Sequence, residues 1–231
     1  MLLLSAGLFA ALAGCSDHPG GPDAPHGDTG VDSRCGADLF YTGEYVDWDS
    51  NDTQFLGIFN AAWSVEGDAT RISHTAPNGR FELCLAHANG TLVDATPDVT
   101  AGSNKDYLPG VVVVEQAVVA SGVITSTRSF TSARRDTLFQ QIGEAYDSTK
   151  GQLFVHLTNT TATLSISGAH AATQAYTNPT WAAGDTGTYV FFPNITLAGG
   201  TVTLTASTPV SGAGTIPLTA GKLTYVEVAA P

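Results

Sequence analysis

The sequence predicts an all-β fold made of two small antiparallel β-sandwich units, which follow a signal peptide and a flexible tether. After Arg34, short runs rich in Val, Ile, Thr, Phe and Tyr alternate with Gly, Asn, Asp or Pro. Several of these runs show the period-two alternation of half-buried strands. A turn with a glycine followed by an alternating strand also occurs twice, around Gly79 and around Gly187. This weak repeat favours two similar units.

The first residues form a targeting segment. Residues 2–13 are an apolar run, followed by Gly14 and Cys15. A run of roughly a dozen residues is too short to span about 30 Å of hydrocarbon, but suits the core of a signal peptide. We therefore expect residues 1–14 to be a signal peptide. The pattern departs from the usual one because no Lys or Arg precedes the apolar run.

The tetrapeptide LAGC at residues 12–15 resembles the lipobox of bacterial lipoproteins. The resemblance implies cleavage before Cys15, diacylglycerol on its thiol and further acylation, commonly with palmitate. Its implied partner is a membrane of the bacterial cell envelope, and Ser16, which stands where some enteric bacteria place an inner-membrane retention Asp, favours the outer membrane. The alternatives are an ordinary secretory signal with an incidental cysteine, or a buried core helix.

Residues 15–34 are expected to be the lipidated cysteine and a disordered linker. Pro, Gly and Asp dominate this stretch, and Val31 is its only large aliphatic residue. Such a composition buries too little apolar area to offset the entropy of ordering the chain.

The remaining cysteines predict one disulfide. If Cys15 carries lipid, only Cys35 and Cys84 are left, and an oxidising compartment would pair them. Closing a loop of about 50 residues would stabilise the fold by roughly 4 kcal/mol. Two separate buried thiols are the alternative.

The charge balance excludes one class of partner. The chain has 21 acidic and 9 basic residues. A protein that binds duplex nucleic acid needs a basic face to replace the phosphate counterions, so no nucleic-acid partner is expected. The acidic, Gly- and Thr-rich composition is typical of a solvated extracellular protein.

We expect one sandwich at residues 35–135 and the second at 146–231. Strands are expected at 55–63, 80–85, 110–119, 122–128, 152–157, 162–167, 188–192, 201–206 and 223–228. Residues 201–205, TVTLT, place Val202 and Leu204 on one face and the threonines on the other. The run at 110–119 suits a fully buried strand, with an exposed edge strand as the alternative. A helix is expected at 136–145, where apolar residues recur at helical spacing.

The segment TAPNGRFEL at residues 75–83 resembles the signature of carboxypeptidase regulatory-like domains. The resemblance implies small transthyretin-like sandwiches that lack catalytic residues and act as modules or spacers. It covers about half of the mature chain, and the immunoglobulin-like sandwich is the main rival. A glycine turn before a strand fits many sandwiches, so the motif has low specificity.

The acidic segment at residues 47–52 is a candidate Ca²⁺ site. Asp47, Asp49 and Asn51 present side-chain oxygens at alternating positions, as a Ca²⁺ loop does. Asp52 stands where an EF-hand needs Gly, and Ile58 where it needs a bidentate Glu, which excludes an EF-hand. A looser Ca²⁺ site competes with a solvated turn whose Asp and Asn side chains bond their own backbone. No other cofactor is expected.

No catalytic residues are assigned from the sequence. The chain has no G-x-S-x-G elbow and no H-E-x-x-H zinc motif. Trp48 and Trp181, each flanked by polar turn residues, are the candidates for stacking on sugar rings, with packing in a core or at an edge as the alternative. Arg128, Arg134 and Arg135 form a basic cluster that suits either an anionic partner or a solvated linker.

The sequence therefore favours a non-enzymatic, lipid-anchored surface protein. Its sandwiches would bind a carbohydrate or another envelope protein, or act as spacers. The alternative is a hydrolase of envelope or extracellular polymers, with a site assembled from dispersed Asp, Glu and His residues.

Overall fold

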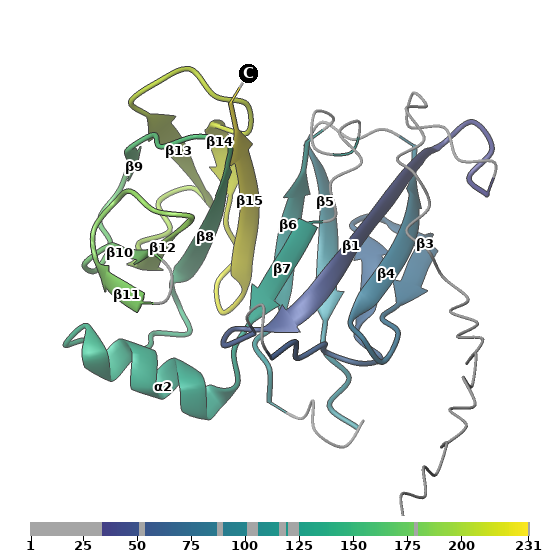
Figure 1. Ribbon diagram of the computed structural model, residues 1–231, viewed down its shortest axis with the longest axis horizontal. Coiled ribbons are helices and arrows are strands. Elements are labelled where there is room, and N and C mark those ends of the chain that lie inside the picture. The colour runs from purple at the N-terminus through teal and green to yellow at the C-terminus, as the bar shows by residue number, and fades with distance from the viewer. Residues whose placement is uncertain are drawn as a thin grey trace, which may run out of the picture.

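The computed structural model describes residues 34–50, 54–86, 90–100, 106–115, 119, 125–177 and 180–230. The described chain is mostly β-strand, arranged in two halves side by side (Figure 1), which confirms the all-β sandwich fold. The signal peptide and Cys15, predicted from the sequence, lie outside the described residues, as does the tether before Arg34. No helix in the described ranges is long and apolar enough to cross a membrane.

Seven strands form the first half of the chain. They are β1 (Leu39–Asp47), β2 (Ala62–Val65), β3 (Asp68–His74), β4 (Arg80–Leu85), β5 (Thr91–Thr96), β6 (Gly110–Val114) and β7 (Thr125–Ser129). Helix α2 (Ser132–Gln141) follows β7. The second half contains β8 (Gly151–Thr158), β9 (Leu164–Ile166), β10 (Gln174–Thr177), β11 (Thr180–Ala183), β12 (Tyr189–Ile195), β13 (Thr201–Ala206), β14 (Gly214–Pro217) and β15 (Leu223–Ala229).

One nine-stranded sheet runs through both halves, in the order β11-β10-β12-β8-β15-β6-β5-β2-β3. The C-terminal strand β15 joins them, because it pairs in parallel with β8 on one side and with β6 on the other. Two three-stranded sheets, β4-β1-β7 and β14-β13-β9, complete the fold. The sequence did not reveal the parallel pairs. The domain bounds 35–135 and 146–231 stay a prediction.

The small sheets pack on opposite faces of the large one, which gives two hydrophobic cores. Side chains of β1, β4 and α2 share the first core with Val112, Val114 and Tyr225 of the large sheet. The neighbours Val113 and Val226 belong to the second core, with side chains of β9, β13 and β14. Successive residues of β6 and β15 thus point into different cores, which explains why these strands are apolar throughout.

Two strands behave as their patterns predict. In β13, Val202 and Leu204 are buried while Thr201, Thr203 and Thr205 are exposed. The apolar run at 110–114 is the fully buried strand β6, between β15 and β5. Most of the strand expected at 55–63 does not form: only Ala62 and Trp63 enter β2, and Phe55 and Phe59 are exposed in the preceding segment.

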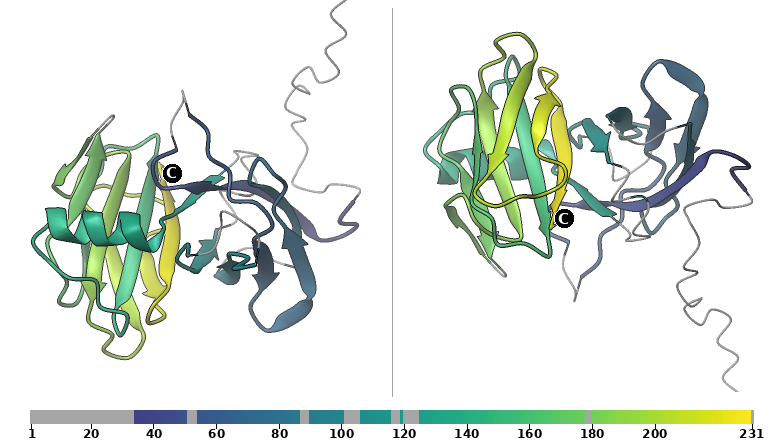
Figure 2. Two further views of the ribbon diagram at one scale, coloured as in Figure 1. Left: turned by 90° about the horizontal axis from the view of Figure 1, so that it is seen from below. Right: turned by 90° about the horizontal axis from the view of Figure 1, so that it is seen from above.

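Helix α2 begins four residues before the expected start at 136. The side chain of Thr131 caps it by accepting a hydrogen bond from the backbone N–H of Arg134 at 3.3 Å. Gly143, with φ of +74°, lies just beyond the helix end, where a left-handed residue commonly terminates a helix. Leu138 and Phe139 are buried, as the helical spacing predicts. Figure 2 shows α2 lying across the strands of the second half.

The turn at Gly79 needs glycine for two reasons. Gly79 has φ of +78°, and a Cβ atom there would lie 2.2 Å from the backbone oxygen of Tyr45. This close approach lets the Tyr45 N–H donate to the carbonyl oxygen of Gly79 at 2.9 Å. The glycine in the predicted turn thus allows β4 to start directly beside β1.

The predicted disulfide between Cys35 and Cys84 is confirmed. The Cα atoms of the two cysteines are 5.4 Å apart, a usual spacing for a disulfide. The bond ties the segment before β1 to β4, which pairs with β1.

Candidate functional site

The turn after β1 buries Trp48. Asp47 Oδ1 accepts a hydrogen bond from the backbone N–H of Asp49 at 2.9 Å, which closes a local Asx turn. The Trp48 side chain is only 2% exposed. Its ring contacts three rings edge-on, those of Phe130, Phe154 and Phe191. Trp48 therefore forms the base of the site rather than its exposed surface.

Trp181 covers Trp48. The two rings are stacked, with centroids 4.8 Å apart and an interplanar angle of 21°. Trp181 lies on the edge strand β11 and stays partly exposed. The structure thus brings together the two tryptophans that the sequence singled out, and Trp181 is the one that a ligand can reach directly. A binding role for either residue stays a prediction.

Trp181 begins a row of side chains that crosses five neighbouring strands. Directly paired positions run from Trp181 to Tyr176, Tyr189, His156 and Glu227. Directly opposed residues share a face of a sheet, so these side chains line up on one face. The ring centroids are 5.3 Å apart between Trp181 and Tyr176, 5.9 Å between Tyr176 and Tyr189, and 4.7 Å between Tyr189 and His156. The row forms an aromatic surface.

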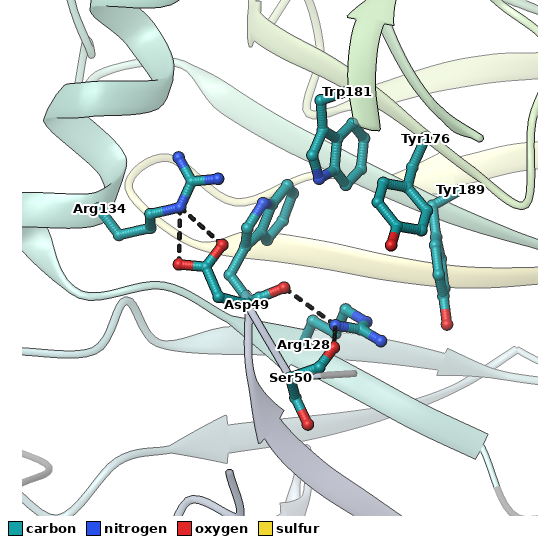
Figure 3. A pocket seen from close by; sticks show the side chains of 8 residues that line it. Asp49, Ser50, Arg128, Arg134, Tyr176, Trp181 and Tyr189 are labelled. Carbon is teal, nitrogen blue, oxygen red and sulfur yellow. Dashed lines mark hydrogen bonds and ion pairs between the residues drawn. The ribbon is translucent and has the colours of Figure 1, made fainter. Parts of the chain in front are cut away.

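Two arginines face this aromatic row. Arg128, on β7, donates from Nη1 to the carbonyl oxygens of Trp48 at 2.9 Å and Ser50 at 2.6 Å. Its guanidinium carbon lies 5.0 Å from the ring centroid of Tyr189, a cation–π distance. Arg134, on α2, donates from Nε to both carboxylate oxygens of Asp49 at 2.9 Å. Figure 3 shows Arg134 and Asp49 to the left of Trp181, Arg128 below it and Tyr189 to its right.

These groups enclose a pocket of about 290 Å³, near the lower end of the usual range for small-ligand sites. Its lining residues are Trp48, Asp49, Ser50, Arg128, Arg134, Tyr176, Trp181 and Tyr189. A second pocket of about 510 Å³ lies between α2 and strands β10 and β11, and Trp181 lines both.

In the described part of the acidic segment after β1, the carboxylate oxygens of Asp47 and Asp49 accept hydrogen bonds. Tyr107 donates its hydroxyl to Asp47 Oδ2 at 2.6 Å, while Asp47 Oδ1 holds the Asx turn. Burial, and then the hydrogen bond to Asp47, raises the pKa of Tyr107, so this hydroxyl stays protonated at neutral pH. Asp49 is paired with Arg134. Of these contacts, the Asx turn of Asp47 is the kind of backbone bond that the solvated-turn alternative predicts, whereas the bonds to Tyr107 and Arg134 join distant parts of the chain.

The Ca²⁺ hypothesis stays untested. Asn51, its third proposed ligand, lies outside the described residues. In the part of the chain that the structure describes, no three His, Cys, Asp or Glu side chains are placed to hold a metal ion.

The sequence contained a signal for the pairing of Tyr176 with Trp181. The segment YTNPTW at residues 176–181 places the two aromatic residues at equal distances from an Asn-Pro turn signal. In the structure these two residues are directly paired on β10 and β11, so the two rings fall opposite each other. The contribution of Tyr189, and the convergence of Arg128 and Arg134 on these rings, had no comparable local signal. Arg135 pairs with Asp136 and does not line the pocket.

Comparison with known proteins gives no family. No protein-family model and no curated protein matches the chain. Among solved structures, the chain is similar to GBS52, the minor pilin of Streptococcus agalactiae, with 9% identity, a TM-score of 0.24, and coverage of 83% of this chain and 96% of that one. It is also similar to the Bacillus anthracis TIE protein, with 10% identity, a TM-score of 0.24, and coverage of 83% of this chain and 33% of that one. Because both TM-scores are low, we draw no argument from either structure.

Proposed function

We propose that this protein is an exported, lipid-anchored binding protein of the bacterial cell envelope, whose pocket between Trp181 and Arg128 holds a carbohydrate. The observation that carries the proposal is the aromatic row, in which Trp181, Tyr176 and Tyr189 line a pocket together with charged and polar groups. Apolar faces of sugar rings pack on aromatic side chains, while hydroxyl groups need hydrogen-bond partners at the rim. The pocket offers both.

The geometry favours binding over hydrolysis. Asp49 is the carboxylate among the described residues that line the pocket, and Arg134 holds both of its oxygens. A carboxylate whose two oxygens both accept from one guanidinium is fixed in position, which suits a structural or hydrogen-bonding role. We therefore propose a non-catalytic module.

Two features support export and anchoring. The Cys35–Cys84 disulfide is typical of proteins in an oxidising compartment outside the cytosol. The sequence LAGC at residues 12–15 supports lipid on Cys15, and Ser16 favours delivery to the outer membrane. A lipid anchor with several acyl chains would hold the domain firmly at the surface.

Replacing the lipidation residue tests the anchor. We expect the wild-type protein to fractionate with membranes and to carry added acyl mass, whereas Cys15→Ser is released without it. Intact-mass spectrometry of both proteins, after membrane fractionation, measures this. The matched control is Cys35→Ser, which removes a cysteine but should keep the acyl mass. Wild-type protein that is soluble and unacylated would contradict the proposal.

Removing the exposed ring of the pocket tests carbohydrate binding. On a glycan array containing neutral and acidic oligosaccharides, we expect Trp181→Ala to lose binding by about tenfold, since an aromatic contact contributes roughly 1 kcal/mol beyond its buried area. Phe55→Ala is the control, because Phe55 is 50% exposed and does not line the pocket. Equal binding by Trp181→Ala and wild type would place the site elsewhere.

A further inference from the structure

Arg128 and Arg134 each have N–H donors without a hydrogen-bond partner among the described residues. Arg128 uses Nη1 for two backbone carbonyls, and its Nη2 makes no hydrogen bond with a described residue. Arg134 uses only Nε for Asp49, and Figure 3 shows its two terminal nitrogens pointing away from that carboxylate. Both arginines therefore have terminal guanidinium nitrogens without a hydrogen-bond partner among the described residues.

Among the described residues, no carboxylate pairs with the positive charge of Arg128. Of the ion pairs between described residues, none includes Arg128, which contacts neutral carbonyl oxygens instead. The described lining residues contain two arginines and one carboxylate, Asp49. The pocket thus has a local excess of positive charge in a chain whose formal net charge is −12.

The surroundings of Arg128 increase the effect of that charge. Its Nε is buried without a hydrogen-bond partner among the described residues, as is Nε1 of Trp48, which also lines the pocket. Both nitrogens carry N–H groups that point a positive partial charge into their surroundings. Among the described residues, no acceptor bonds either N–H group. A partly buried guanidinium loses hydration, and an anion placed beside it compensates that loss through charge-assisted hydrogen bonds.

We propose that the ligand of this pocket is an acidic saccharide, a sugar ring that bears a carboxylate or sulfate group. The ring packs against Trp181 and Tyr176, and the anionic group bonds the free guanidinium donors of Arg128 and Arg134. The inference rests on the proposed carbohydrate-binding function and names its ligand class. The second pocket beside Trp181 accommodates further sugar units, so oligosaccharides are the appropriate probes.

The test compares ligands that differ only in charge, with the wild-type full-length protein. Tetramers of galacturonate, glucuronate and mannuronate are titrated by calorimetry against the same tetramers with methyl-esterified carboxylates, and a sulfated tetramer forms a further arm. We expect at least one acidic ligand to bind about tenfold more tightly than its neutral counterpart. A salt concentration near 0.15 M, where the Debye length is about 8 Å, screens long-range repulsion by the acidic protein.

Three variants then locate the contact. Arg134→Gln is expected to weaken binding of the acidic tetramer about tenfold, whereas Asp49→Asn, which removes the competing carboxylate, is expected to strengthen it about threefold. Arg135→Gln on the same helix is the control and should bind like wild type, because Arg135 pairs with Asp136 outside the pocket. Arg128 is kept intact, since Nη1 also holds the turn at Trp48 and Ser50.

The outcomes separate the two proposals. Tighter binding of a uronate or a sulfated tetramer, lost in Arg134→Gln, supports the inference and says which anionic group the site prefers. Equal binding of acidic and esterified tetramers overturns the inference but leaves carbohydrate binding standing. If no saccharide of either kind binds, the proposed function fails as well.

Discussion

Reduction of the Cys35–Cys84 disulfide is expected to lower the free energy of unfolding by about 4 kcal/mol. The bond joins residues 49 positions apart, so its loss gives the unfolded chain a long loop of additional freedom. It also releases the segment before β1, the strand that pairs with both β4 and β7. Denaturant unfolding with and without dithiothreitol, followed by circular dichroism, measures the difference.

The control is the double variant Cys35→Ala/Cys84→Ala. Its stability should match that of reduced wild type and should not change when dithiothreitol is added. A wild-type protein whose unfolding midpoint is the same in both conditions would contradict a stabilising role for the bond.

Trp63→Ala is expected to lower the free energy of unfolding by about 3–5 kcal/mol, as truncation of a large buried ring does. Trp63 is fully buried on β2 and stacks on Phe81 of β4, with centroids 3.6 Å apart. It also contacts the ring of Tyr45 edge-on at 5.6 Å. The ring therefore links the large sheet to the β4-β1-β7 sheet, and its removal leaves a cavity between them. Urea unfolding followed by circular dichroism measures the change.

Trp63→Phe and Ile72→Ala calibrate this result. The indole Nε1 of Trp63 has no hydrogen-bond partner among the described residues, so Phe removes an unsatisfied donor and should cost only about 1 kcal/mol. Ile72 is 52% exposed, and its truncation should change stability by less than about 0.5 kcal/mol. If Trp63→Ala cost no more than Ile72→Ala, the described packing of this core would be wrong.

The sequence predicted correctly those features that depend on a short stretch of chain. The alternation in 201–205 and the apolar run in 110–114 correspond to β13 and β6, because each strand's own side chains decide which faces are buried. Strand β1 was missed, although Tyr41 and Tyr45 alternate with Thr42 and Glu44, because Gly43 interrupts the apolar pattern. The strand expected at 55–63 was wrong because an apolar segment alone does not ensure strand pairing.

Only part of the candidate site could be predicted from the sequence. Trp48 and Trp181 were predicted as candidates because polar turn residues flank them in the sequence, and the structure stacks the two rings with centroids 4.8 Å apart. Burial of Trp48 could not be read from its polar neighbours, because the rings that cover it come from β8, β12 and the segment after β7. The acidic segment at 47–52 suggested Ca²⁺, but the carboxylates of Asp47 and Asp49 contact Tyr107 and Arg134, which are distant in the sequence.

By itself, the sequence determined the fold class, the disulfide partners and the buried faces of individual strands, since composition and side-chain alternation act over short distances along the chain. Only the tertiary structure decided that β15 joins the halves through parallel pairing, and that Arg128 and Arg134 meet the row from Trp181 to Tyr189. Strand order and the meeting of side chains on different elements depend on the packing of whole sheets. No local pattern specifies that packing.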